Sequence, residues 1–157
     1  MPPMAIGSSG CGTGGWKKSD EWRVISDERM NSSEPKKPGS YRDLIVWQKA
    51  MTLARLIYGL TQKFPSEEKF GLTSQMRRAA VSIPSNIAEG QARRGSREFI
   101  QFISQAEGSL AELDTQLTLA TDLGYTDPSR ASESVALIEE LRRMLNALRR
   151  NLEAPRP

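Results

Sequence analysis

Apolar residues recur at steps of three and four in four separate stretches of the chain, which is the spacing of one face of an α-helix. These stretches predict helices over about residues 43–63, 66–91 and 96–123, and a fourth from Asp127 toward the C-terminus. The connections between them are short, as between antiparallel neighbours. The pattern therefore predicts an all-α protein, an antiparallel up-down-up-down four-helix bundle over residues 41–154.

The expected core follows from the same spacing. Apolar residues of the third and fourth predicted helices repeat with heptad periodicity, which is typical of helix-bundle interiors. The predicted core positions are Val46, Ala50, Leu53, Ile57, Leu60 and Phe64, then Phe99, Ile103, Ala106, Leu110, Leu113, Leu117 and Ala120, and finally Ile138, Leu141, Leu145, Leu148 and Leu152.

The first predicted helix carries more apolar surface than one buried contact requires. Its apolar side chains cover roughly 200° of the circumference, whereas a helix packed on one side needs little more than about 100°. The excess predicts a contact with another subunit, and Trp47 and Tyr58 are the candidate anchors of that contact. Packing within the core of one subunit is the alternative for both aromatic residues.

The predicted helix boundaries are placed at two kinds of residue: those whose side chains bond the unpaired N–H groups of a helix start, and glycine or proline, which end a helix. The predicted starts carry Asp43, Ser66 with Glu67 and Glu68, Ser96, and Asp127 followed by Pro128. The predicted ends carry Pro65, Gly90 with Gly95, and Gly124.

The second predicted helix combines a proline with two neighbouring stripes. Pro84 has no N–H to donate to the carbonyl four residues earlier, so a helix that contains it is expected to bend there. The apolar stripe consists of Leu72, Met76, Ala79, Ile83 and Ile87. The polar seam consists of Gln75, Arg78, Ser82, Asn86, Glu89 and Arg93. This seam is either a satisfied hydrogen-bond network at a helix contact or a surface that meets a partner.

Charge is balanced in total but uneven in distribution. The formal net charge is +3, and residues 41–153 contain 15 basic and 14 acidic residues. Arginine, whose planar guanidinium binds phosphate through two hydrogen bonds, gathers near the end of the second predicted helix and on the last one. The candidate nucleic-acid contacts are Arg77, Arg78, Arg93, Arg94 and Arg97, with Gln75 and Asn86 as hydrogen-bonding partners. A solvated helix face with acidic neighbours is the alternative.

The aromatic residues fall mostly at core-like positions of the pattern. Proteins that bind unpaired nucleic acid usually offer exposed aromatic rings on which bases stack. We therefore expect phosphate contacts that position a nucleic acid, without recognition of an unpaired sequence.

Composition argues against several kinds of chemistry. The chain has no histidine and one cysteine, Cys11, so the usual ligand sets of zinc and di-iron sites are missing. No base of the usual kind is present to activate a serine nucleophile such as Ser82. We expect no catalysis, no metal and no cofactor.

No run of about 18 apolar residues is present, and the N-terminus lacks the basic start and apolar stretch of a secretion signal. We therefore expect a cytoplasmic protein. Residues 1–40 are rich in glycine, serine, proline and charge, and are predicted to be a disordered tail. An alternative is that translation starts at Met30.

Several separated motifs together resemble a known family. They are Tyr41-Arg42-Asp43-Leu44 with Trp47, the run Gln75, Arg78, Ser82-Ile83-Pro84, Asn86-Ile87-Ala88-Glu89-Gly90 and Arg93, then Glu98-Phe99, Gly108-Ser109-Leu110 with Glu112-Leu113, and Leu123-Gly124-Tyr125. In this order, over roughly Tyr41 to Glu153, they are similar to the bacterial four-helix-bundle proteins encoded within intervening sequences of 23S ribosomal RNA genes.

That resemblance implies a ring-shaped homopentamer without catalytic activity that binds structured RNA or a nucleic-acid enzyme. The arginines themselves would suit the phosphates of structured RNA or of an RNA–DNA intermediate. It also implies a relation to the accessory variability determinant of diversity-generating retroelements. The alternative function is a protein scaffold, for example for a reverse transcriptase, with no nucleic-acid contact. In that case a structural seam fixes the helix bend and register, and its residues are Ser82, Pro84, Glu89 and Gly90.

Overall fold

The computed structural model describes residues 39–93 and 95–155. Within these residues there is no β-strand, and the helices are η2 (Tyr41–Asp43), α1 (Ile45–Thr61), η3 (Ser66–Phe70), α2 (Leu72–Ala92), α3 (Ser96–Asp122) and α4 (Pro128–Glu153), where η denotes a 3-10 helix. The predicted all-α fold with four long helices is confirmed. The predicted disorder of the N-terminal tail and the start at Met30 concern residues outside this description.

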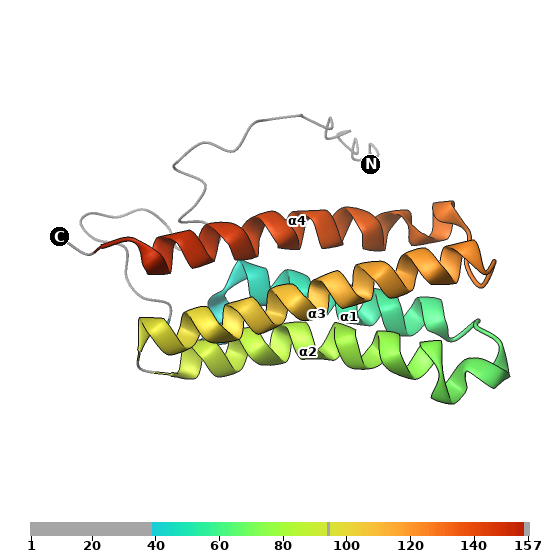
Figure 1. Ribbon diagram of the computed structural model, residues 1–157, viewed down its shortest axis with the longest axis horizontal. Helices are drawn as coiled ribbons and strands as arrows, with labels where there is room; N and C mark the ends of the chain where they lie inside the picture. Colours follow the sequence, from blue (N-terminus) through green and yellow to red (C-terminus); the bar gives the residue numbers. More distant parts are fainter. Residues whose placement is uncertain (1–38, 94, 156–157) are drawn as a thin grey trace, which may run out of the picture.

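The four long helices lie side by side along the long axis of the molecule (Figure 1). The colours run in opposite directions along successive helices, so the chain reverses at each connection. Each helix packs against two others: α1 and α3 both contact α2, and both also contact α4. This arrangement encloses one core between the four helices.

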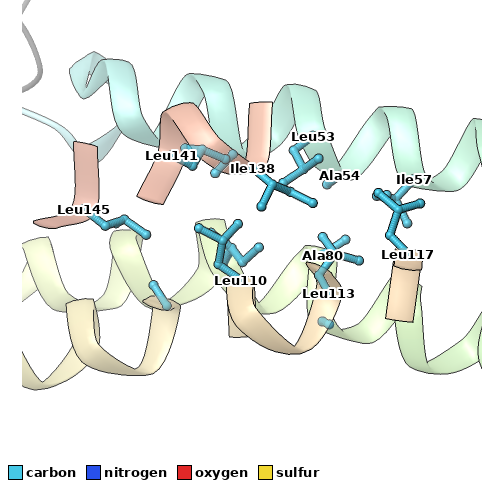
Figure 2. Close-up of a cluster of buried hydrophobic side chains, with 14 of the residues drawn as sticks. Leu53, Ala54, Ile57, Ala80, Leu110, Leu113, Leu117, Ile138, Leu141 and Leu145 are labelled. Carbon is cyan, nitrogen blue, oxygen red and sulfur yellow. The ribbon is translucent and has the colours of Figure 1, made fainter. Parts of the chain in front are cut away.

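Apolar side chains from all four helices meet in that core (Figure 2). Leu53 of α1, Ala80 of α2, Leu113 of α3 and Ile138 of α4 are each fully buried. The predicted core positions are buried throughout, apart from Phe99 and Leu152, which are half-buried. Heptad spacing therefore identified the core because the helices that carry it are long and continuous.

The predicted start of the second long helix was wrong. Residues from Ser66 onward form η3, and α2 begins only at Leu72. Gly71 breaks the helical path, with φ −101° and ψ −121°. The Glu68 carboxylate occupies the space beside Gly71 and accepts a hydrogen bond of 2.8 Å from the Leu72 N–H. An acidic side chain at this end also complements the helix dipole.

Gly90 does not break α2, in contrast to the prediction, because the helix continues to Ala92. Gly90 is buried, and a Cβ atom placed on it would lie 2.6 Å from Cδ2 of Phe99 and 2.7 Å from Cβ of Phe102. These two rings belong to α3. The glycine is therefore required by the close approach of the two helices and not by a turn.

The other boundaries agree with the sequence in part. Gly124 follows α3 with φ +74°, and the Asp127 carboxylate caps α4 by accepting from the Arg130 N–H at 3.0 Å, with Pro128 as the first helical residue. Hydrogen bonds from Ser129 and Arg130 lower the pKa of Asp127. By contrast, Gly95 and not Ser96 is the N-cap of α3.

Asp43 does not cap α1. It belongs to η2, where its carboxylate accepts from the Ser40 N–H at 3.0 Å and completes a capping box with Ser40. Leu44, which has no side-chain acceptor, is the N-cap of α1.

Pro84 lies buried inside the continuous helix α2. The next two side chains reach back to the turn before it: Ser85 Oγ donates to the Val81 carbonyl at 2.8 Å, and Asn86 Nδ2 donates to the Ser82 carbonyl at 2.9 Å. Both are local side-chain bonds to the carbonyl four residues earlier. The carbonyl that Pro84 cannot serve, because proline has no N–H, is that of Ala80. The bend itself stays a prediction.

The contact at Gly90 generates a stability prediction. We expect Gly90→Ala to lower the free energy of unfolding by about 1–3 kcal/mol, because the added methyl group overpacks the contact with Phe99 and Phe102. Gly59→Ala is the matched control: nothing lies within 4 Å of its Cβ position, so better helix propensity should raise stability by about 0.5–1 kcal/mol. Urea unfolding monitored by circular dichroism measures the free energy of unfolding of both variants. Equal changes of the same sign in the two variants would contradict this account of Gly90.

Candidate functional site

One open groove lies along α2 and reaches the end of α1 and η3. Its volume is about 680 Å³. The lining residues are Tyr58, Lys69, Phe70, Thr73, Ser74, Arg77, Arg78, Val81, Ser82 and Ser85. Three of them are basic, several carry hydroxyl groups, and none of these described residues is acidic. The groove thus offers positive charge beside exposed apolar surface.

Arg77 is held in place by its neighbours on α1. Its Nε donates a hydrogen bond of 2.9 Å to Thr61 Oγ1, and its guanidinium carbon lies 4.7 Å from the centroid of the Tyr58 ring. Thr61 in turn donates to the Ile57 carbonyl at 2.8 Å. These contacts fix the plane of the guanidinium and leave its two terminal NH2 groups without a partner among the described residues. Pre-organisation of this kind reduces the entropy lost on binding an anion.

Arg78 is exposed, and none of the described residues forms an ion pair or hydrogen bond with it. Gln75, one turn earlier on α2, is exposed as well. Lys69 is the third cation of the groove, and its Nζ lies 5.5 Å from the centroid of the Phe70 ring. Lys69 and Arg78 therefore form no ion pair among the described residues.

The remaining candidate arginines of α2 and α3 form a separate group. Arg93 is about 22 Å from Arg78 along the helix, at a rise of about 1.5 Å per residue. It pairs with Glu89 at 2.7 Å and lies 5.4 Å from the centroid of the Phe102 ring. Arg97 is exposed at the start of α3, and Arg94 lies outside the described residues. The predicted arginine cluster is thus divided between two ends of α2.

The polar seam is also divided. Asn86 Nδ2 donates to Ser82 Oγ at 3.0 Å as well as to the Ser82 carbonyl, and the Ser82 hydroxyl lies 2.8 Å from Ser109 Oγ on α3. These groups form a satisfied network between two helices. Glu89 pairs with Arg93 of its own helix, while Gln75 and Arg78 face solvent. One part of the seam therefore joins helices and the other is free for a partner.

Two of the five arginines of α4, Arg142 and Arg149, are paired with acids of α3 and α4. Arg142 forms a hydrogen bond of 2.9 Å with Asp114, which raises the pKa of the guanidinium, and it also pairs with Glu139. Arg149 lies 3.4 Å from Glu107. Half-exposed ion pairs contribute little to the free energy of unfolding. They do neutralise part of the positive charge of α4, whereas the groove lining contains no acidic residue.

The two candidate interface aromatics have different surroundings. Trp47 is half-buried and packs edge-to-face on Tyr41, with ring centroids 5.3 Å apart. Tyr58 remains 43% exposed beside Arg77. Within one subunit, Tyr58 thus retains the larger free surface.

Sequence reasoning missed Lys69 and Phe70. Both were placed in the first turns of a long helix, where an aromatic residue usually packs inward. Phe70 instead ends η3 and is 88% exposed. Gly71, which directly follows, was the available signal that the helix is interrupted there.

The fold and groove define an all-α four-helix bundle with a basic, partly apolar surface on its second long helix. Residues 42–147 match the family described as 23S rRNA-intervening sequence protein, and the chain belongs to this family. Comparison with curated proteins finds no match. Across residues 39–93 and 95–155, no helix has the length and hydrophobicity needed to span a membrane. The same residues contain no group of three or more cysteine or acidic side chains arranged to hold a metal ion.

The seam network generates a second stability prediction. We expect Ser82→Ala to lower the free energy of unfolding by about 1–2 kcal/mol, because it removes bonds to Asn86 and Ser109 at a half-buried helix contact. Ser85→Ala is the matched control on the same helix: its hydroxyl is exposed, so water replaces the lost bond and the change stays within about 0.5 kcal/mol. Thermal unfolding compares the two variants. A Ser82→Ala protein as stable as the Ser85→Ala protein would show that the network adds no net stability.

Proposed function

We propose that this protein is a non-enzymatic accessory factor that binds structured RNA, or an RNA–DNA intermediate, through phosphate contacts. The observation that carries the proposal is the groove on α2, in which Lys69, Arg77 and Arg78 gather without an acidic residue. Phosphate oxygens accept hydrogen bonds from arginine in a bidentate geometry, and such contacts are largely independent of sequence. Membership of the 23S rRNA-intervening sequence protein family is compatible with an accessory role.

The absence of catalysis is part of the proposal. The chain contains no histidine. The hydroxyl of Ser82 is engaged with Ser109 and Asn86, and neither neighbour is a base that would activate it as a nucleophile.

We also propose that the protein self-associates, as a homopentamer by resemblance to its family, in the cytoplasm. Large apolar side chains that remain exposed in the single subunit support association. Leu119 of α3 and Val135 of α4 are such side chains, and neither lines the groove. In a symmetric ring each basic groove is repeated, and the repeated positive charges reinforce one another in attracting a polyanion.

A protein partner is the second candidate function. Tyr58, Phe70 and Val81 expose apolar surface in the same groove, which favours a partner with both apolar and acidic groups. A reverse transcriptase is such a candidate, and it accords with a proposed relation to the accessory variability determinant of diversity-generating retroelements.

RNA binding is tested by fluorescence anisotropy with a structured RNA at two salt concentrations. We expect affinity to fall steeply as salt rises, and Arg78→Glu to weaken binding about tenfold or more at low salt. Arg143→Glu is the matched control, because it changes the net charge equally at an exposed arginine of α4 outside the groove. Arg93→Glu with Arg94→Glu tests the other end of α2.

The outcomes separate the candidates. No binding by the wild-type protein at low salt removes the RNA proposal and leaves the protein scaffold. Equal losses for Arg78→Glu and Arg143→Glu would assign the effect to overall charge and not to the groove. The full chain and a chain starting at Met30 are titrated in parallel, which shows whether residues 1–29 contribute.

A further inference from the structure

Phe70 presents an aromatic ring to solvent next to a cation. The side chain is 88% exposed, and Lys69 Nζ lies 5.5 Å from the ring centroid. A single exposed apolar side chain is common, but Phe70 lines the same groove as the exposed Tyr58 and Val81, and apolar surface gathered among polar groups marks an interaction site. Phe70 is thus an exception to the expectation that the aromatic residues lie mostly at core-like positions.

The backbone that carries Phe70 is held firmly. Glu68, two residues earlier, accepts a hydrogen bond of 3.0 Å from the Tyr125 hydroxyl and one of 2.8 Å from the Leu72 N–H. The first bond joins η3 to the connection between α3 and α4, and the second joins it to α2. The bond to Glu68 also raises the pKa of Tyr125, because the carboxylate accepts from the protonated phenol. Phe70 is therefore exposed on an anchored turn.

The rest of the groove supplies contacts for a phosphate. Arg77 lies against the Tyr58 ring and retains free NH2 groups, and Arg78 has no partner among the described residues. A cation lies over each ring, but Phe70 is 88% exposed and Tyr58 43%, so the ring of Phe70 is the more open stacking surface. Aromatic rings that stack bases, together with cations that follow the backbone, are the two elements by which proteins bind unpaired nucleic acid.

We propose that this groove binds an unpaired nucleotide of an RNA loop, with its base stacked on Phe70 and its neighbouring phosphates at Lys69, Arg77 and Arg78. The inference rests on the proposed RNA binding. It adds that the part of the structured RNA in contact with the groove is unpaired. The absence of carboxylates from the groove lining favours a polyanion, and the exposed ring favours a base over a bare phosphate. Base stacking tolerates any sequence, so the preference is for unpaired structure and not for a motif.

The test uses two RNA hairpins of equal length and charge, one fully paired and one with an internal loop of mismatched nucleotides. Anisotropy at low salt is expected to show tighter binding of the looped hairpin by about 5-fold or more, the usual effect of one stacked base. Phe70→Ala should remove this preference and keep the affinity for the paired hairpin. Phe70→Trp should retain the preference, and its added indole fluorescence should be quenched by the looped RNA.

Leu123→Ala is the matched control, because Leu123 is an exposed apolar residue at the end of α3 and does not line the groove. It should leave both affinities unchanged. Circular dichroism of each variant establishes that it is folded, which is expected because Phe70 makes little contact with the core.

Failure of the inference and failure of the proposed function give different results. Equal binding of both hairpins by the wild-type and Phe70→Ala proteins overturns the stacking site while RNA binding stands. Binding of neither hairpin at low salt overturns the proposed function, and the inference with it. The third outcome uses an acidic peptide that contains an aromatic residue. If wild-type protein binds this peptide, Phe70→Ala does not, and neither hairpin binds, the groove is assigned to a protein partner.

Discussion

The close contact between α2 and α3 is the constraint on which the rest of the molecule depends. Gly90 meets the ring of Phe99 and the Cβ atom of Phe102 without room for a methyl group. Further along the two helices, the hydroxyls of Ser82 and Ser109 lie 2.8 Å apart. Two contacts separated along a helix fix its rotation about its own axis. With a turn of about 100° per residue, that rotation decides which residues of α2 face the core and which face solvent.

The groove is a consequence of this rotation. Ala79, Ala80 and Ile83 are directed to the core, so Arg78, Val81 and Ser85 lie outside. Arg77 lies between these two groups, where Thr61 and Tyr58 of α1 can hold its guanidinium. The anchored turn at Glu68 then adds Lys69 and Phe70 to the same surface. Packing in the core and exposure of the basic surface are therefore two results of one helix placement.

Pairing with acids distinguishes the basic regions more clearly than the number of arginines does. The α4 arginines Arg142 and Arg149 lie near Asp114 and Glu107 of α3, and Arg93 lies near Glu89. Partial neutralisation lowers the local positive potential that a phosphate experiences, since opposite charges at short range cancel each other's field. Arg78 and Lys69 lack such partners in the described residues, and together with Arg77 they line one groove that has no acidic residue in its lining. This gathering of cations makes the groove the strongest candidate among regions that look equally basic in sequence.

The sequence by itself determined the four helices, the heptad core and the ends marked by Gly124 and Asp127, because helix periodicity and capping are local properties of the chain. It also supplied Arg77 and Arg78 as candidates. Only the tertiary structure decided that Gly90 is a packing residue and not a helix breaker, since its role depends on two rings from another helix. Similarly, Phe70 is exposed because Gly71 ends η3 and Tyr125, which is distant in sequence, anchors that turn through Glu68. Contacts between residues far apart in the chain leave no periodic signal, so the site they build had to be found in three dimensions.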